Sequence, residues 1–475
     1  MSTRARWMLP TVLLAGCLLT PGGEAAQDQA AVDVEPLLLA LDGMRRAGEV
    51  PAMAVVIVDG GRPVVVTGLG RARAETPFRW GSITKSFTGL AALTLVRDGR
   101  IRLDSPVRPV LGADYFDNPW AARTPVRFVH LLTLSAGLAD LSRAEWDGST
   151  PEPLWTALRR YAPERLVRWP PGLQHSYSNA PPGLTAAVIE RLTGLTFEDY
   201  LTERVFAPLG MTAATLLPVA GLPGGYQADG RTEIPYWHMT YPAFGALNAS
   251  AADMSRFLTA LVIGGRVPDA AGLPGDLIER FFRPDGTLGT GAGLEVGYGA
   301  GIYGRVRDGH VILGHGGDAD GYRARYGVLP EHGRGYALVI NTDNPRLLGR
   351  MVRQVESALL ADLPAHPAPV GPAEDLTRYA GTYYPSSSRF GRRPGSASPT
   401  ERAEITVAGN GLRFRRSSRT TTLLPAGGGR FYRPGDPAVT AVFVPQGPNL
   451  YLQGELGNFV NLGTGPCPDF LGACE

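Results

Sequence analysis

The chain has 475 residues, of which 44% are hydrophobic, and a formal net charge of +2. This composition excludes a largely disordered protein, and the length predicts two or three domains. The net charge is too small to indicate a nucleic-acid partner. The seven histidines form neither His-x-His nor His-Glu-x-x-His, and there are only three cysteines. We therefore expect no metal site and no cofactor.

Residues 1–26 are typical of an export signal. Arginines precede an apolar stretch from Leu9 to Leu19, which is shorter than the ~20 residues that span a bilayer. Two processing routes are open. Small residues within 23–25 suit an ordinary signal peptidase, whereas the segment ending at Cys17 resembles a lipobox, whose cysteine is acylated. We expect an exported protein, either periplasmic, secreted or lipid-anchored in the bacterial envelope.

An oxidising compartment follows from export. Cys467 and Cys474 have six residues between them and predict a local disulfide there. Contact with a membrane is expected only through a lipid on Cys17.

The first domain after the export signal is predicted to span 32–362 and to mix strands with helices. Val-rich runs flank Asp59-Gly60-Gly61 and predict a hairpin. Apolar periodicity predicts helices elsewhere, including one from about Ser82 to Arg97 with an apolar face. The further predicted helices cover 183–193, 197–206, 251–262 and 345–361, and the further strands cover 309–314, 322–329 and 336–340.

A change of pattern follows residue 362. Four prolines between 363 and 373 predict a stiff linker, and short alternating strands over 374–475 predict a small all-β domain. Within it, 386–399 reads as a mobile loop. Eight arginines against two glutamates over 386–419 leave open a basic surface for anionic cell-wall polymer, although a solvated loop is the simpler reading.

Lys85 is the single lysine of the chain, and the other 45 basic residues are arginines. A GC-rich genome explains arginine at surface positions but not this exception. Lysine can lose its proton when desolvated, whereas arginine cannot. Ser82 precedes it by three residues, so one helical turn places both on one face. A serine beside an amine that accepts its proton is an activated nucleophile.

Two further segments supply polar groups. Tyr177 could handle a second proton, because a neighbouring ammonium favours its phenolate. Asn179 could orient Lys85 and bind a substrate amide. Residues 314–318 (Gly-His-Gly-Gly-Asp) end a predicted strand, where glycines permit close backbone approach to a ligand. His315 could hold a substrate carboxylate or complete the proton network, whereas His130 is expected to be structural.

Together these segments resemble the class C β-lactamase-related serine hydrolases, a family of penicillin-recognising enzymes, DD-peptidases, D-aminopeptidases and esterases. The resemblance spans about 330 residues. The segments that carry it are Gly81-Ser82-Ile83-Thr84-Lys85-Ser86-Phe87-Thr88, His130-Leu131-Leu132-Thr133-Leu134-Ser135-Ala136-Gly137-Leu138, Tyr177-Ser178-Asn179, Ala251-Ala252-Asp253-Met254 and Gly314-His315-Gly316-Gly317.

The resemblance implies an α/β (α+β) fold of the β-lactamase/transpeptidase type: an antiparallel sheet flanked by helices, an all-helical lobe, and a small C-terminal β-barrel-like domain. It implies Ser82 as the acylated nucleophile, with Lys85 and Tyr177 as the proton-transfer pair. The backbone N–H groups of Ser82 and Asp318 would form the oxyanion hole, beside the substrate-binding segment of Asn179, His315, Gly316 and Gly317.

One departure from the family pattern bears on the substrate. Class C β-lactamases carry Lys-Thr-Gly where this chain has His315-Gly316-Gly317, so a charge suited to the β-lactam carboxylate is missing. We therefore expect a D-amino-acid peptidase or a small-ester hydrolase acting on a small molecule or peptide. A β-lactamase and a non-catalytic envelope-binding pseudoenzyme are the alternatives.

Overall fold

The computed structural model describes residues 32–389 and 401–463. The predicted signal segment 1–26, Cys17, Cys467, Cys474 and most of the predicted loop 386–399 lie outside these residues. By its contacts, the chain from Val32 onward forms one compact unit. The boundaries predicted at 362–363 and 373–374 therefore stay a prediction. Among the described helices, none is both long enough and apolar enough to cross a membrane.

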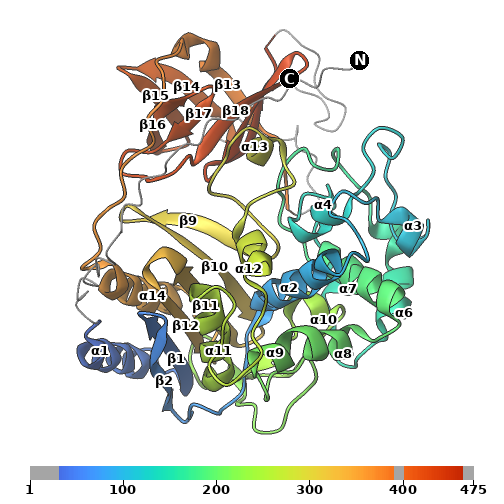
Figure 1. Ribbon diagram of the computed structural model, residues 1–475, viewed down its shortest axis with the longest axis vertical. Helices are drawn as coiled ribbons and strands as arrows, with labels where there is room; N and C mark the ends of the chain where they lie inside the picture. Colours follow the sequence, from blue (N-terminus) through green and yellow to red (C-terminus); the bar gives the residue numbers. More distant parts are fainter. Residues whose placement is uncertain (1–31, 390–400, 464–475) are drawn as a thin grey trace, which may run out of the picture. The chain divides into compact units, whose positions relative to one another are not determined.

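A six-stranded antiparallel sheet forms the centre of the catalytic region (Figure 1), in the order β2-β1-β12-β11-β10-β9. The predicted hairpin joins its first two strands through Gly60 and Gly61, whose φ angles of 56° and 74° give the turn its mirror-image twist. The strands are β1 (Ala52–Asp59), β2 (Arg62–Gly70), β9 (Tyr303–Arg307), β10 (His310–Ala319), β11 (Tyr322–Leu329) and β12 (Arg334–Ile340).

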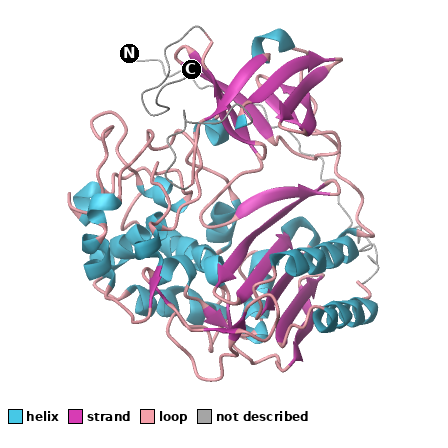
Figure 2. Ribbon diagram, turned by 180° about the vertical axis from the view of Figure 1, so that it is seen from behind, coloured by secondary structure: helices cyan, strands magenta, loops and turns pink. Residues whose placement is uncertain are grey.

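Both faces of the central strands are covered, which explains their continuous apolar runs. Met53, Val55 and Ile57 point to one face, where α1 (Val34–Ala47) and α14 (Pro345–Leu360) pack. The alternate residues Ala54 and Val56 point to the other, where α11 (Ala251–Val262) packs. Figure 2 shows these layers from behind. The alternation follows from the two-residue period of a strand.

A helical lobe lies beside the sheet and shares its core. Its helices include α3 (Arg108–Leu111), α4 (Phe128–Leu132), α5 (Arg143–Trp146), α6 (Leu154–Arg160), α7 (Ala180–Thr193), α8 (Phe197–Leu201), α9 (Ala207–Leu209) and α10 (Pro242–Gly245). The helices α12 (Gly275–Phe282) and α13 (Leu288–Gly291) lead into β9. The predicted 197–206 helix is α8 continued by a π-helical turn over Thr202–Phe206.

The central helix differs from its prediction in two respects. Ser82 lies in a short 3₁₀ turn, η1 (Gly81–Ile83), and the α-helix α2 runs from Thr84 to Arg97. Its predicted apolar face is buried, but all the remaining residues from Thr84 to Leu95 are buried as well. The helix lies inside the shared core of sheet and lobe, so it has no solvent face over most of its length.

The C-terminal residues form a closed eight-stranded barrel. Its core consists largely of aromatic rings, among them Tyr379, Tyr383, Phe431 and Phe443. The closed ladder leaves no free sheet edge, which is how a small β domain avoids edge pairing. The strands are β13 (Gly381–Pro385), β14 (Ala403–Ala408), β15 (Gly411–Arg416), β16 (Arg419–Gly427), β17 (Arg430–Tyr432), β18 (Ala441–Gln446), β19 (Asn449–Gly454) and β20 (Gly457–Asn461).

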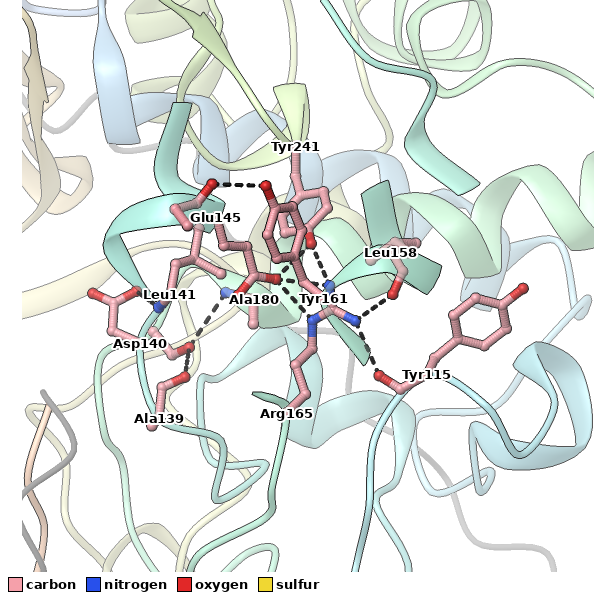
Figure 3. Close-up of polar contacts among 12 residues, drawn as sticks. Tyr115, Ala139, Asp140, Leu141, Glu145, Leu158, Tyr161, Arg165, Ala180 and Tyr241 are labelled. Carbon is pink, nitrogen blue, oxygen red and sulfur yellow. Dashed lines mark hydrogen bonds and ion pairs between the residues drawn. The ribbon is translucent and has the colours of Figure 1, made fainter. Parts of the chain in front are cut away.

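A buried ion pair fastens the helical lobe. Arg165 donates to Glu145 Oε1 from Nε at 3.0 Å and from Nη2 at 2.7 Å. The Tyr241 hydroxyl donates to the same oxygen at 2.5 Å. Figure 3 shows these three side chains converging, with Nη1 of the arginine reaching the backbone oxygens of Tyr115 and Leu158. The pair therefore joins five separate segments of the lobe.

Replacing Arg165 with methionine is expected to destabilise the fold by about 3–5 kcal/mol, because it leaves the Glu145 carboxylate buried without its cation. Urea unfolding of the variant measures this loss. Arg160→Met is the matched control, since Arg160 pairs with Glu152 but is 59% exposed and should change stability by less than about 1 kcal/mol. Equal effects of the two changes would contradict this view of the buried pair.

Candidate active site

The turn that carries Ser82 is pressed against the end of β10. Gly81 has a φ of 52°, and a β-carbon on it would lie 2.5–2.7 Å from backbone atoms of Asp318. A β-carbon on Gly317 would lie 1.8 Å from the carbonyl oxygen of Trp80. Only glycine fits at both positions. From the sequence, the glycines of 314–318 were expected to permit close approach to a ligand, and the contact seen here is instead between the backbones of β10 and η1.

Lys85 is buried, with 2% of its surface exposed, and its amine contacts three oxygens. Nζ lies 2.6 Å from Asn179 Oδ1, 2.9 Å from the carbonyl oxygen of Phe244 and 2.9 Å from Ser82 Oγ. Two of these oxygens, in an amide and a carbonyl, can only accept. A neutral amine has two N–H bonds and one lone pair. With both N–H bonds directed at those acceptors, the lone pair faces the Ser82 hydroxyl.

Electrostatics favour that neutral amine. Burial lowers the pKa of Lys85 well below its ordinary value, since desolvation penalises the ammonium. The carboxylates of Asp140 and Asp318 oppose this shift, and the positive charge of Arg389 adds to it. The net shift is downward, so Lys85 loses its proton more readily than a free lysine does.

Asn179 is held in one orientation by Asp140. Its Nδ2 donates to Asp140 Oδ1 at 3.0 Å, and its backbone N–H donates to the same oxygen at 2.8 Å. The amide oxygen is therefore turned toward Lys85. The predicted orienting contact between Asn179 and Lys85 is present, and the carboxylate behind it was not predicted.

Tyr177 lies beside both residues of the Ser-x-x-Lys pair. The Lys85 amine is 5.0 Å from the centre of its ring, and its hydroxyl hydrogen-bonds with the Ser82 side chain. Burial raises the pKa of Tyr177, and the hydrogen bond from Ser82 only partly offsets this. The predicted shift toward phenolate is wrong in direction, because desolvation outweighs it and the neighbouring lysine is itself driven toward neutrality. At neutral pH Tyr177 is a hydroxyl donor.

His315 is neutral and both of its ring nitrogens are engaged. Burial, which penalises the imidazolium, lowers its pKa to about 3. Nδ1 lies 2.6 Å from the Gly316 carbonyl oxygen, which can only accept, so Nδ1 carries the proton. Nε2 then accepts from the Tyr298 hydroxyl at 2.9 Å. Two roles were predicted for His315: holding a substrate carboxylate and completing the proton network. A neutral imidazole offers no positive charge to a carboxylate, so this state does not favour the first role.

The remaining predicted residues occupy the end of β10. Gly316 supplies the carbonyl that fixes the histidine tautomer, and Gly317 makes the close approach to Trp80. The Asp318 side chain is 71% exposed and pairs with Arg323 at 2.8 Å, so only its backbone faces the η1 turn. His130, expected to be structural, accepts from the Arg127 backbone N–H at 3.1 Å and caps α4.

Arg389 reaches this site from the segment that follows β13, a contact that was not predicted from the sequence. Its Nε donates to Asp140 Oδ2 at 2.7 Å, and its guanidinium carbon lies 4.7 Å from the centre of the Tyr177 ring. The segment is fastened by Ser386, whose backbone oxygen accepts from Gln174 Nε2 at 2.6 Å. No local motif could have revealed a contact 249 residues away in the chain.

A cavity of about 370 Å³ opens on the other side of Tyr177. Aromatic rings line it, and His175 stacks on Tyr298 at 4.7 Å. Barrel residues, including Gln453 and Asn458, complete its wall. The cavity is therefore mostly apolar with a few polar groups in its lining, as ligand sites generally are, and it reaches the site through Tyr177.

Fold and site together define a β-lactamase/transpeptidase-like protein with an added barrel. A family model described as "Beta-lactamase" matches residues 39–360, and the chain belongs to that family, whose members are serine hydrolases. Penicillin-binding protein 4 of Amycolatopsis lactamdurans is 28% identical over 72% of this chain and 95% of its own length. A β-lactamase of Yersinia enterocolitica is 28% identical, over 44% of this chain and 55% of its own length.

Among solved structures, the octameric penicillin-binding protein homologue from Pyrococcus abyssi superimposes with a TM-score of 0.56 and 23% identity. The match covers 90% of this chain and all of that structure, so it confirms the fold.

Proposed function

We propose that this protein is an exported serine hydrolase that cleaves amide bonds in peptides through an acyl-enzyme on Ser82. The observation that carries the proposal is the set of contacts around Lys85. Its amine lies 2.9 Å from Ser82 Oγ, and its other two contacts are with oxygens that can only accept. Burial favours the neutral amine, whose lone pair is then the group left to face Ser82. The environment of Lys85 is that of a general base aimed at a nucleophile.

The proton balance follows from the protonation states. Ser82 transfers its proton to Lys85 as Oγ bonds to the substrate carbonyl carbon. The carbonyl oxygen becomes an oxyanion that accepts hydrogen bonds from the backbone N–H groups of Ser82 and Asp318. Tyr177 gives its hydroxyl proton to the leaving nitrogen as the carbon–nitrogen bond breaks, and the Lys85 ammonium restores that proton. Water then attacks the ester by the reverse sequence.

The substrate class is proposed from charge and shape. His315 is neutral, whereas the guanidinium of Arg389 lies over the Tyr177 ring with 42% of its side chain exposed. A guanidinium at this place suits the terminal carboxylate of a peptide. A D-amino-acid peptide is favoured over a β-lactam because His315-Gly316-Gly317 stands where class C β-lactamases carry Lys-Thr-Gly.

The proposed function is tested with D-amino-acid amides, D-Ala-D-Ala peptides and nitrophenyl esters, comparing the parent protein with Ser82→Ala. We expect turnover of at least one amide or peptide by the parent and none above background by the variant. Turnover of esters alone would make the protein a small-ester hydrolase. Hydrolysis that survives Ser82→Ala would overturn the mechanism.

Arg389→Gln is expected to raise KM about tenfold or more for a peptide with a free carboxylate, since the change removes the charge that binds it. The amidated peptide should be affected much less. The acidic limb of kcat/KM should also move to higher pH, because Arg389 lowers the pKa of Lys85 and its loss lets that pKa rise. Steady-state kinetics against pH measure both effects.

Arg389→Lys is the matched control, because it keeps the positive charge. It should retain the acidic limb of the parent while losing part of the carboxylate preference, since lysine cannot bind a carboxylate bidentately. If Arg389→Gln alters free and amidated peptides alike, the arginine acts only through Asp140.

A further inference from the structure

Three histidines that are far apart in the sequence meet at the opposite end of β10 from the proposed active site. His310 begins β10, His332 ends the 3₁₀ turn η4 (Pro330–His332), and His366 lies in the proline-rich segment after α14. One ring nitrogen of each lies within 4.8 Å of those of the other two. The chain has seven histidines in all, so this grouping takes nearly half of them. The sequence expectation of no metal site rested on the absence of a local His motif, and separations of 22 and 34 residues form none.

Two of these rings carry buried nitrogens that lack hydrogen-bond partners within the described residues, namely Nδ1 of His310 and Nε2 of His332. His310 is only 1% exposed. A buried polar atom without a partner costs free energy and is rare in folded proteins. The backbone of Leu363 hydrogen-bonds with the His310 ring. A ring that donates from one nitrogen to a carbonyl presents a lone pair on the other, as metal-bound imidazoles do.

The simpler reading is aromatic packing. The His310 ring lies edge-to-face with those of His332 and His366, with centres 5.5 and 5.2 Å apart. Packing alone, however, leaves the two unpartnered nitrogens unexplained, whereas a cation between the three rings would satisfy both. Phenylalanine would pack as well without that cost.

A fourth ligand lies beside the cluster. Glu331 Oε2 is 3.5 Å from His366 Nε2, and its side chain is 77% exposed. The same four residues line a cavity of about 600 Å³. Nitrogens bound to one tetrahedral zinc ion at about 2.0–2.1 Å lie roughly 3.3 Å apart. The ring nitrogens must therefore approach one another by up to about 1.5 Å. His366, whose side chain is 37% exposed on a segment without helix or strand, can move to allow this.

We propose that His310, His332 and His366 bind one zinc-class divalent transition-metal ion, with the Glu331 carboxylate as the fourth ligand. Imidazole nitrogens suit zinc, copper and nickel rather than magnesium or calcium. The bound ion ties the proline-rich segment to η4 and to the start of β10. Its role is structural, because the ligands are distinct from every residue placed around Ser82, and the hydrolytic mechanism does not use it.

The test uses the full-length chain without a histidine tag, stripped with a chelator and titrated with Zn²⁺ by calorimetry. We expect about one ion per chain, a higher thermal midpoint with zinc, and binding weakened at least about tenfold in His332→Gln and in His366→Gln. His238→Gln is the matched control, since His238 is partly exposed and lies outside the cluster. It should bind zinc like the parent.

Cobalt gives a second readout on the parent protein alone. Bound Co²⁺ should show the visible d–d bands of a tetrahedral site. This measurement needs no variant, so misfolding of a variant cannot affect it. Absence of Zn²⁺ binding at micromolar concentration would overturn the proposal. The same holds if His366→Gln binds zinc as tightly as the parent, because the partly exposed His366 can be replaced without disturbing the core.

Discussion

Exchanging Lys85 for arginine is expected to lower kcat/KM by about 10³-fold or more, although every other basic residue of the chain is already arginine. The guanidinium keeps the positive charge but cannot give up its proton, so it cannot accept one from Ser82. It is also larger than the ammonium and must fit a site that is 2% exposed. The loss should therefore fall on kcat as well as on kcat/KM, in single-turnover and steady-state kinetics alike.

The control for this exchange is the opposite substitution, arginine to lysine, at an exposed position. Arg102 is 82% exposed and contacts Asp104, so Arg102→Lys should leave both stability and rates unchanged. Near-normal rates in Lys85→Arg would mean that residue 85 supplies only positive charge. Such a result would contradict the neutral amine inferred from its three contacts.

The pH dependence of kcat/KM in the parent protein tests the same neutral state of Lys85. Because burial lowers the pKa of Lys85, the amine should be neutral well below the pH at which a free lysine loses its proton. kcat/KM should therefore rise as pH increases through that lowered pKa and stay high into the alkaline range. Burial raises the pKa of Tyr177, which places any alkaline loss beyond the ordinary range for tyrosine.

Replacing Tyr177 with phenylalanine is expected to lower kcat by about 10²–10⁴-fold for amides, the contribution typical of a positioned proton donor. An amine leaves poorly unless it is protonated, whereas nitrophenolate leaves readily without help. The same variant should therefore lose much less activity on a nitrophenyl ester. Stopped-flow measurement of the acylation step with an amide and an ester of the same acyl group separates the two.

Tyr303→Phe is the matched control, because Tyr303 lies against His315 with ring centres 5.4 Å apart but has no place in the proton transfer. Equal losses on amide and ester in Tyr177→Phe would show that the tyrosine positions Ser82 rather than protonating the leaving group.

Much of the fold could be predicted because short stretches of sequence determine where its helices and hairpins begin and end. Ser250 and Asp253 form a reciprocal cap that starts α11 at Ala251, and paired glycines close the first hairpin. The all-round burial of α2 could not be predicted from periodicity, since its surroundings come from the sheet and the lobe together. The π-helical turn after α8 likewise leaves no pattern of its own.

The residues of the site likewise fall into those that the sequence could predict and those that it could not. Ser82 and Lys85 could be paired because one helical turn separates them, and the rarity of lysine marked the position. Asp140 and Arg389 could not be found, because each acts through a contact with a residue distant in the chain. The protonation of Tyr177 was predicted in the wrong direction because sequence shows neighbouring charges but not the depth of burial.

The most direct measurement of the central claim is the intact mass of the protein incubated with a labelled penicillin and, separately, with a nitrophenyl ester, followed over time. Our account predicts a covalent adduct with at least one of them, located by peptide mapping on Ser82 and absent in Ser82→Ala. A long-lived penicillin adduct would identify slow deacylation and a penicillin-binding peptidase. An adduct on any other residue, or substrate turnover by the Ser82→Ala protein, would contradict the account.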